Sequence, residues 1–288
     1  MRSELERAIG LLRQGDPENV NRALALLQGT VLSFGIKICG QREDAEDTAQ
    51  EVLFRALPHL AKLGDPRSLS AWLYTAAKNR CWQGRRRATY QRAVALDDLI
   101  PSDAELHALL LADPEPSPEH LALRRQDHQL LHEAILSLPP QYRIVLVLHD
   151  MEEMDTELVA RILSIQPGTV RIRLHRARLL LRKAMVGPSR VAKPKERKKP
   201  AVRRPAECRE IFGNLSDYLD GELEPESCEH MRQHVEGCPA CVAFMQDLKR
   251  AIDRCRSLEL CPEPEASPAL RRLLTEEYLR LKNSNQRL

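Results

Sequence analysis

Apolar side chains recur at helical spacing along much of the chain, and the pattern is clearest between Leu136 and Met185. There the apolar positions form two short series, as expected of two amphipathic helices that share one core. The tripeptide Gln166-Pro167-Gly168 separates the series and favours a tight turn. The apolar positions are Ile144, Leu146, Val147, Leu158, Val159, Ile162 and Leu163, followed by Val170, Leu174 and Ala177. This pattern predicts a helix-turn-helix.

Polar residues mark the ends of the two predicted helices. Asp155 and Thr156 form a helix-start signal, and the first helix is expected to end near Ser164, after which Thr169 caps the second helix. In a helix-turn-helix, side chains near the start of the second helix enter the major groove and later arginines meet phosphates. A solvated amphipathic helix is the plainer alternative. We predict DNA contacts for Thr169, Arg171, Arg173, His175, Arg176 and Arg178.

The remaining sequence also favours helices. Only 4% of the 288 residues are aromatic and 12 are glycine, whereas Leu, Ala, Arg and Glu are abundant. Such a composition predicts an all-α protein, and the chain length allows two or three small domains. The first ninety residues continue the amphipathic pattern through Ala23–Cys39.

A basic helix is predicted between Ser68 and Arg87, after a turn at Gly64-Asp65-Pro66. Trp72 is expected in the core of this part of the chain. The basic residues gather at the far end of the helix, where cations can follow the phosphates of melted DNA while a neighbouring loop holds a flipped base. They are Lys78, Arg80, Arg85, Arg86 and Arg87.

The charge of +3 is unevenly distributed along the chain. Eight Lys or Arg residues lie between Pro188 and Arg204, in a proline-broken segment without aromatic residues that is expected to be a flexible tether. Eight acidic residues follow between Glu207 and Glu229. This change of sign marks a domain boundary and suggests an acidic module able to lie against a basic one.

The acidic module contains a pattern typical of a metal site. His234 and Cys238 are one helical turn apart, Cys241 completes a CxxC, and Cys208 lies upstream. Three thiolates and one imidazole form a closed tetrahedral Zn²⁺ site, which is structural rather than catalytic. A redox CxxC without metal and simply buried cysteines are the alternatives, and Cys228 and His230 are rival ligands. Cys255 and Cys261 lie outside the motif, and we weigh a redox trigger, a second metal such as copper and no role for them.

Four segments of the sequence resemble one family of bacterial transcription factors. LSLPPQYRIVLVL and TELVARILSIQPGTVRIRLHRAR resemble region 4 of sigma factors, above all the extracytoplasmic-function type, although Leu158 stands where that family usually has glutamate. DAED-x-x-QEV-x-F-R and AWLY-x-x-A-x-NR resemble region 2. The resemblance implies core RNA polymerase, through its β′ and β subunits, and promoter DNA as partners. It also implies polymerase contacts for Asp47, Gln50 and Glu51, and DNA contacts for Gly64, Asp65, Arg67, Ser68 and Asn79.

The cysteine segment resembles the zinc-binding anti-sigma domain, through YLDGEL and H-x-x-x-CPAC. We therefore expect a sigma factor with a fused regulator, and a helix-turn-helix regulator that does not recruit polymerase is the alternative. The expected parts are region 2 at 1–95, a linker at 96–127, region 4 at 128–186, a basic linker at 187–204, the zinc domain at 205–262 and an amphipathic helix at 263–288.

The expected location of the protein and its expected lack of enzymatic activity both rest on features that the sequence lacks. The N-terminus lacks the apolar stretch of a signal peptide, and no segment approaches the roughly 18 apolar residues that cross a bilayer, so we expect a cytoplasmic protein. In a reducing cytoplasm the eight cysteines are expected to be ligands, sensors or buried residues rather than structural disulfides. No general-base constellation is present, so we expect no enzymatic activity.

Overall fold

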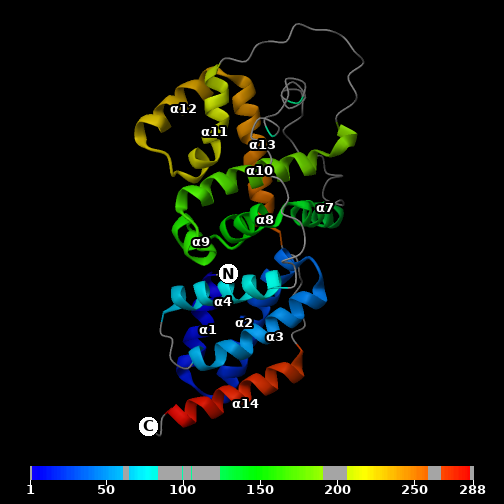
Figure 1. The fold of residues 1–288 in the computed structure, drawn as a ribbon, viewed down its shortest axis with the longest axis vertical. Helices are drawn as coiled ribbons and strands as arrows, with labels where there is room; N and C mark the ends of the chain where they lie inside the picture. The colour runs from blue at the N-terminus through cyan, green and yellow to red at the C-terminus, as the bar shows by residue number, and fades with distance from the viewer. Residues whose placement is uncertain are drawn as a thin grey trace. The chain divides into compact units, whose positions relative to one another are not determined.

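The computed structural model describes residues 2–60, 65–83, 99, 105, 124–190, 206–258 and 267–285. Within these ranges the ordered elements are helices and no strand is present, so the expectation of an all-α fold is confirmed (Figure 1). The chain forms two compact units. The first comprises Met1–Tyr90, Val147–Ile165 and Glu259–Leu288, and the second comprises Gln91–Leu146 and Gln166–Leu258.

The first unit is built on helix α2 (Pro17–Cys39), which packs against α1 (Arg2–Gln14), α3 (Arg42–Leu60) and α4 (Pro66–Gln83). Asp16 caps α2 by accepting a hydrogen bond from the backbone N–H of Asn19 at 3.0 Å, and Gly40 ends the helix in the left-handed conformation. By length and composition α2 is apolar enough to cross a membrane, but most of it is buried among its neighbours. It is therefore the core helix of this unit.

Close packing between α2 and α3 depends on Gly35. A Cβ atom at this position would lie 3.0 Å from the Cβ of Ala45. Any larger residue here would push the two helices apart, because tightly packed cores have little room to accommodate an added methyl group.

A disulfide joins Cys39, at the end of α2, to Cys81 in α4. The expectation that the cysteines avoid disulfides is wrong for this pair. The two helices bring the Cα atoms within 5.7 Å, inside the usual range for a bridge, although the residues are 42 positions apart in the sequence.

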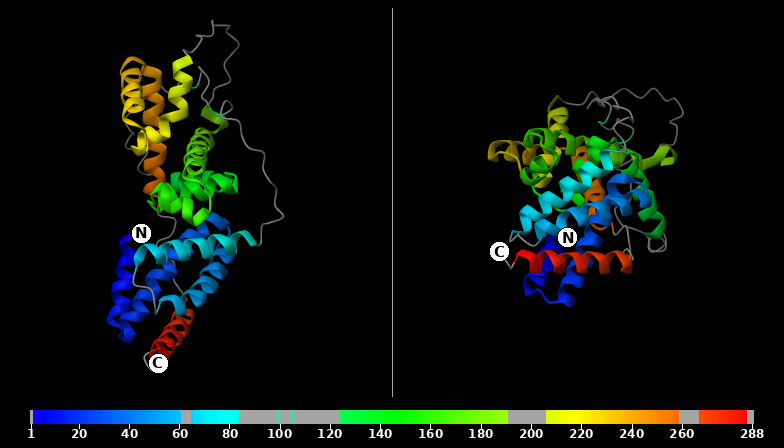
Figure 2. Two further views of the ribbon diagram at one scale, coloured as in Figure 1. Left: turned by 60° about the vertical axis from the view of Figure 1, so that its left-hand side comes forward. Right: turned by 60° about the horizontal axis from the view of Figure 1, so that its bottom comes forward.

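Two later segments complete the first unit. Val147–Ile165 contains a π-helix, η2 (Val147–Met151), and helix α9 (Thr156–Leu163), which packs on α4. Asp155 accepts a hydrogen bond from the N–H of Leu158 and Ser164 ends α9 in the left-handed conformation, so both predicted ends of this helix are confirmed. Helix α14 (Pro268–Asn285) packs on α2 and α3 (Figure 2). Its Leu274 and Tyr278 are buried.

The second unit contains two groups of helices that share α10 (Pro167–Arg190). On one side of it lie α7 (Arg124–Ser137) and α8 (Pro140–Leu146), and on the other α11 (Ala206–Asp220) and α13 (Pro239–Arg256), with α12 (Pro225–Gly237) beyond them. Phe212 and Phe244 meet edge to face at 5.0 Å in the core of the latter group, where Leu179 of α10 is also buried. Helix α10 is thus a core element of both groups.

The start of α10 differs from the prediction. The helix begins at Pro167, and the carbonyl of Gln166 accepts the N–H groups of Thr169 and Val170 at 2.9 and 3.1 Å. Thr169 therefore lies in the first turn and is not the cap. The reason is Pro167, because proline suits the first helical position, where no partner is needed for its missing N–H.

Candidate functional site

Four ligand-type side chains converge where α11, α12 and α13 meet. Cys208 comes from the first turn of α11, His234 from the last turn of α12, Cys238 from the junction and Cys241 from the first turn of α13. Their ligand atoms all lie within 4.8 Å of one another. Nε2 of His234 lies 3.4 Å from the sulfur atoms of Cys208 and Cys241, which are 4.0 Å apart.

These separations fit a tetrahedral zinc ion. Bonds of about 2.3 Å to sulfur and about 2.0 Å to nitrogen place the ligand atoms of such an ion about 3.5–3.8 Å apart. Burial raises the pKa of the Cys241 thiol, and a bound divalent cation would offset that penalty by stabilising the thiolate. The structure thus brings together the four residues that the sequence singles out.

The rival ligands lie elsewhere in the module. Cys228 is half-buried and His230 is exposed on α12, and neither belongs to the cluster. Cys255 is buried in α13. Cys261 lies outside the described residues.

The second feature of this unit is the basic face of α10. Arg171, His175, Arg178 and Arg182 follow one another at spacings of four, three and four residues, so they share one face of the helix. That face lies against α11 and α13. We call these four residues the basic face of α10.

Acidic residues of the cysteine module pair with Arg178 and Arg182, the last two residues of this face. Arg178 donates to both carboxylate oxygens of Asp220 at 2.7 and 2.8 Å, and its side chain is 1% exposed. Arg182 pairs with Asp247 at 2.7 Å and its guanidinium lies 4.6 Å from the centre of the Phe244 ring. Both guanidinium groups therefore have all-protein surroundings that satisfy their charge.

The other two residues of the face make weaker contacts. Nδ1 of His175 lies 2.9 Å from the hydroxyl of Ser216, and burial lowers the pKa of this imidazole to about 4, aided by Arg178 and Arg176. Arg171 is half-buried, 3.9 Å from a carboxylate oxygen of Glu222. Of the predicted DNA contacts on α10, His175 and Arg178 are thus buried. Thr169, Arg171, Arg173 and Arg176 are half-buried.

The predicted DNA contacts of the first unit range from exposed to buried. Asp65 accepts hydrogen bonds from the hydroxyl and N–H of Ser68 and from the N–H of Arg67, which lower the pKa of its carboxyl group. Asp65, Arg67 and Ser68 are exposed at the start of α4. Gly64, Arg85 and Arg86 lie outside the described residues.

Further along α4, Asn79 is exposed but Lys78 is buried, with its ammonium donating to the carbonyl of Ile162 at 2.9 Å. Arg80 is half-buried and pairs with Glu51. Trp72 is half-buried against the ring of His59 at 5.1 Å, so it lies at the margin of the core and not inside it as predicted.

The predicted polymerase contacts lie on α3. Asp47 and Gln50 are exposed, whereas Glu51 is half-buried and pairs with both Arg55 and Arg80. The side chains of Asp47 and Gln50 are therefore accessible, whereas the carboxylate of Glu51 is already paired with two arginines.

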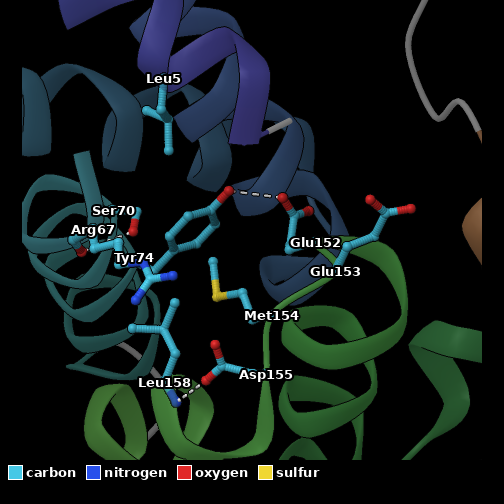
Figure 3. A pocket seen from close by; sticks show the side chains of 9 residues that line it. All are labelled: Leu5, Arg67, Ser70, Tyr74, Glu152, Glu153, Met154, Asp155 and Leu158. Atoms are coloured by element: carbon cyan, nitrogen blue, oxygen red, sulfur yellow. Dashed lines mark hydrogen bonds between the residues drawn. The ribbon is translucent and has the colours of Figure 1, made fainter. Parts of the chain in front are cut away.

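Sequence reasoning missed the buried carboxylate of Glu152. It accepts a hydrogen bond from the hydroxyl of Tyr74 at 2.7 Å (Figure 3). It also pairs with Lys37 at 2.7 Å. Sequence reasoning also missed Arg143, which donates to the carbonyls of Leu136 and Leu138 and so links the end of α7 to α8. The only available signals were an acidic pair in an apolar segment and an arginine after two prolines, and neither names a partner.

Comparisons with known proteins agree with this division of the chain. The family described as "Sigma-70 region 2" matches residues 24–90, "Sigma-70, region 4" matches 128–181, and "Putative zinc-finger" matches 208–241. These matches cover the helices that carry the predicted promoter contacts and the four clustered ligands.

Whole-protein relatives point the same way. The chain is 31% identical over 150 residues to the ECF RNA polymerase sigma factor SigL of Mycobacterium tuberculosis, covering 52% of this chain and 78% of SigL. It is 26% identical over 185 residues to the ECF RNA polymerase sigma factor SigW of Bacillus subtilis, covering 64% and 98%. A probable RNA polymerase sigma factor, RfaY of Xanthomonas campestris, is 30% identical over 172 residues, and this chain spans only 42% of its length. The chain therefore belongs to the extracytoplasmic-function family of RNA polymerase sigma factors, with a zinc-finger-type module after region 4.

Proposed function

We propose that this sigma factor directs core RNA polymerase to promoters in the cytoplasm and that its own zinc module restrains it by covering the basic face of α10. The observation that carries the proposal is the pairing of Arg178 with Asp220. Through this pair an arginine of α10, which would be the recognition helix of the helix-turn-helix, is almost fully buried against the module. A guanidinium that is 1% exposed is not accessible to a phosphate or a base edge.

The module supplies the negative charge that DNA would otherwise supply. Asp220, Glu222 and Asp247 lie near Arg178, Arg171 and Arg182 respectively. DNA phosphates and these carboxylates compete for the same guanidinium groups, so binding of DNA requires the module to leave. The chain between the end of α10 and the start of α11 tethers the module to region 4. A tether of this kind gives effective concentrations on the order of millimolar, at which a modest contact is sufficient.

Zinc would have a structural role in this arrangement. Cys208, His234, Cys238 and Cys241 would hold it, and the ion would fix the ends of α11, α12 and α13 relative to one another. Asp220 and Asp247 lie on two of these helices. Their spacing along the basic face therefore depends on the packing at the cluster.

Polymerase binding is assigned to the exposed side of α3. Asp47 and Gln50 would contact the β′ subunit, and the β subunit would lie near region 4 when the polymerase is bound. The promoter contacts proposed for region 2 are Gly64, Asp65, Arg67, Ser68, Lys78, Asn79, Arg80, Arg85 and Arg86. Of these, Lys78 and Arg80 would first have to leave their protein partners.

Run-off transcription tests the proposal. Full-length protein is compared with a version that ends at Gly187 and with the Cys238→Ser, Cys241→Ser double variant, each with core polymerase on promoter DNA selected from a genomic library. We expect both altered forms to give more transcript than the full-length protein, and Cys228→Ser, whose thiol is outside the cluster, to behave like it. If truncation abolishes transcription while DNA binding survives, the module is an activating part and the proposal is wrong.

A further inference from the structure

The carboxylate of Glu152 is buried and has partners from a different part of the chain. Its side chain is 0% exposed, and it lies between η2 and α9 in the region 4 sequence. One of its oxygens lies 2.7 Å from the ammonium of Lys37 in α2, and the other accepts the hydroxyl of Tyr74 in α4 at 2.7 Å. Figure 3 shows the Tyr74 ring directed at this carboxylate.

The three groups depend on one another. Lys37 is 3% exposed and Tyr74 is 3% exposed, so neither is well placed to exchange its contact for water while the segment remains in place. Burial raises the pKa of Tyr74, and the Glu152 charge raises it further. Removal of one charged partner leaves the other buried and uncompensated, which is strongly unfavourable.

That penalty can be relieved without unfolding. Glu152 belongs to Val147–Ile165, whereas Lys37 and Tyr74 belong to the helices of region 2. If the segment Val147–Ile165 leaves those helices, water hydrates both charges again. The triad of Lys37, Tyr74 and Glu152 therefore stabilises the packing of Val147–Ile165 on α2 and α4 more than it stabilises the individual helices.

The segment Val147–Ile165 makes a second contact with α4, through Lys78, which is predicted to contact DNA. The ammonium of Lys78 donates to the carbonyl of Ile162 at the end of α9, and burial lowers the pKa of this lysine. Arg67, also a predicted DNA contact, lines a small cavity of about 50 Å³ together with Tyr74, Asp155 and Leu158 (Figure 3). The docked segment thus lies directly beside the DNA-reading part of α4.

We propose that Lys37, Tyr74 and Glu152 form a latch that holds Val147–Ile165 on α2 and α4 and keeps Lys78 bonded to protein instead of DNA. Release of the latch frees Lys78 for phosphates of the melted strand. The effect on DNA rests on the proposed role of region 2, but the latch itself does not depend on the role of the zinc module.

Energy transfer on the full-length protein tests the latch. Donor and acceptor dyes are attached through unnatural amino acids at Asn21 and Glu157, which are exposed on α2 and α9. We expect Lys37→Met and Glu152→Gln to lower the transfer efficiency, Tyr74→Phe to lower it less, and the exposed neighbour variant Glu153→Gln to match the wild type. Unchanged efficiency in folded Lys37→Met and Glu152→Gln proteins would overturn the latch. Loss of helical circular dichroism in Lys37→Met would also overturn it, since the triad would then be part of the core.

Binding of a single-stranded oligonucleotide from the selected promoter tests the consequence. The variants that lower energy transfer are expected to bind at least fivefold more tightly, and adding Lys78→Met to Glu152→Gln should remove that gain. An open protein with unchanged DNA affinity would leave the latch in place but contradict its effect on Lys78. If the wild type and every variant fail to bind, the proposed role of region 2 is wrong, while the energy-transfer result still decides the latch.

Discussion

Arg178 in the recognition helix and Asp220 at the end of α11 form a two-bond ion pair at 2.7 and 2.8 Å, with side chains 1% and 8% exposed. Such planar, paired contacts resemble the way arginine binds a phosphate or a guanine edge. The module therefore occupies the recognition helix with the same chemistry that DNA would use. The carboxylate of Asp220 thus competes with DNA for the guanidinium of Arg178, which is more than steric shielding of α10 by the module.

We predict that the zinc content of the protein depends on the four clustered residues and not on the number of cysteines. Full-length protein is expected to carry one zinc per chain, and Cys238→Ser with Cys241→Ser to carry none, because both sulfur atoms are part of the ligand set. Elemental analysis of the purified proteins measures this directly. Cys228→Ser is the matched control and should keep its zinc. Loss of zinc from this control would show that the ligand set is different.

Mild acid should weaken the contact between the module and α10. The pKa of His175 is about 4 in the covered state, against an ordinary value of 6.5 when the face is free. Because the covered-state pKa is depressed, its contribution is present above pH 6.5 and is lost as the pH falls towards 4. Between pH 7.5 and 5.5 the loss is about 1.4 kcal/mol, or about tenfold in the opening equilibrium.

The measurement for this prediction is promoter-duplex affinity of full-length protein at both pH values. The version ending at Gly187 supplies the pH dependence of DNA binding itself. His175→Gln removes the titrating group at similar size and should abolish the additional dependence. An equal pH effect in that variant would assign the effect to zinc loss or another group.

The Cys39–Cys81 bond should stabilise region 2. It closes a loop of 42 residues, for which the chain-entropy relation gives about 4 kcal/mol. Urea unfolding with and without reductant measures the difference, and alkylation followed by mass spectrometry identifies the bonded pair. Cys39→Ser with Cys81→Ser should be insensitive to reductant, whereas Cys228→Ser should remain sensitive. Full alkylation of Cys39 and Cys81 in unreduced protein would contradict the bond.

Features that depend on residues close together in the sequence, such as helix ends and the cysteine spacing, were mostly predicted correctly. Helix α9 begins after Asp155 and ends at Ser164 as expected, because capping depends on residues within one turn. Thr169 was wrongly predicted as a cap because Pro167, which begins α10, satisfies a stronger positional preference. The cysteine spacing likewise indicated the residues that converge, since His234, Cys238 and Cys241 are near neighbours in sequence.

Distant pairings were not accessible in the same way. Arg178 is 42 residues from Asp220, and Arg182 is 65 residues from Asp247. The charge pattern identified an acidic module but could not tell which carboxylate meets which arginine. For the same reason His175 and Arg178 were predicted as DNA contacts although the structure buries both. The Lys37–Glu152 pair spans 115 residues, and nothing in the sequence around Glu152 identified Lys37 as its partner.

Equilibrium binding of full-length Asp220→Asn to promoter duplex DNA tests the central claim most directly. This variant keeps the shape of the side chain but removes the carboxylate that pairs with Arg178. Breaking a buried ion pair in this way costs about 3 kcal/mol in the covered state, or about 100-fold. Fluorescence anisotropy should show duplex affinity at least tenfold above wild type, with Glu229→Gln, which removes an exposed pair with Arg232 in the same module, at the wild-type value. If Asp220→Asn and wild type bind equally while the version ending at Gly187 binds more tightly, the module does not restrain the protein through the basic face of α10.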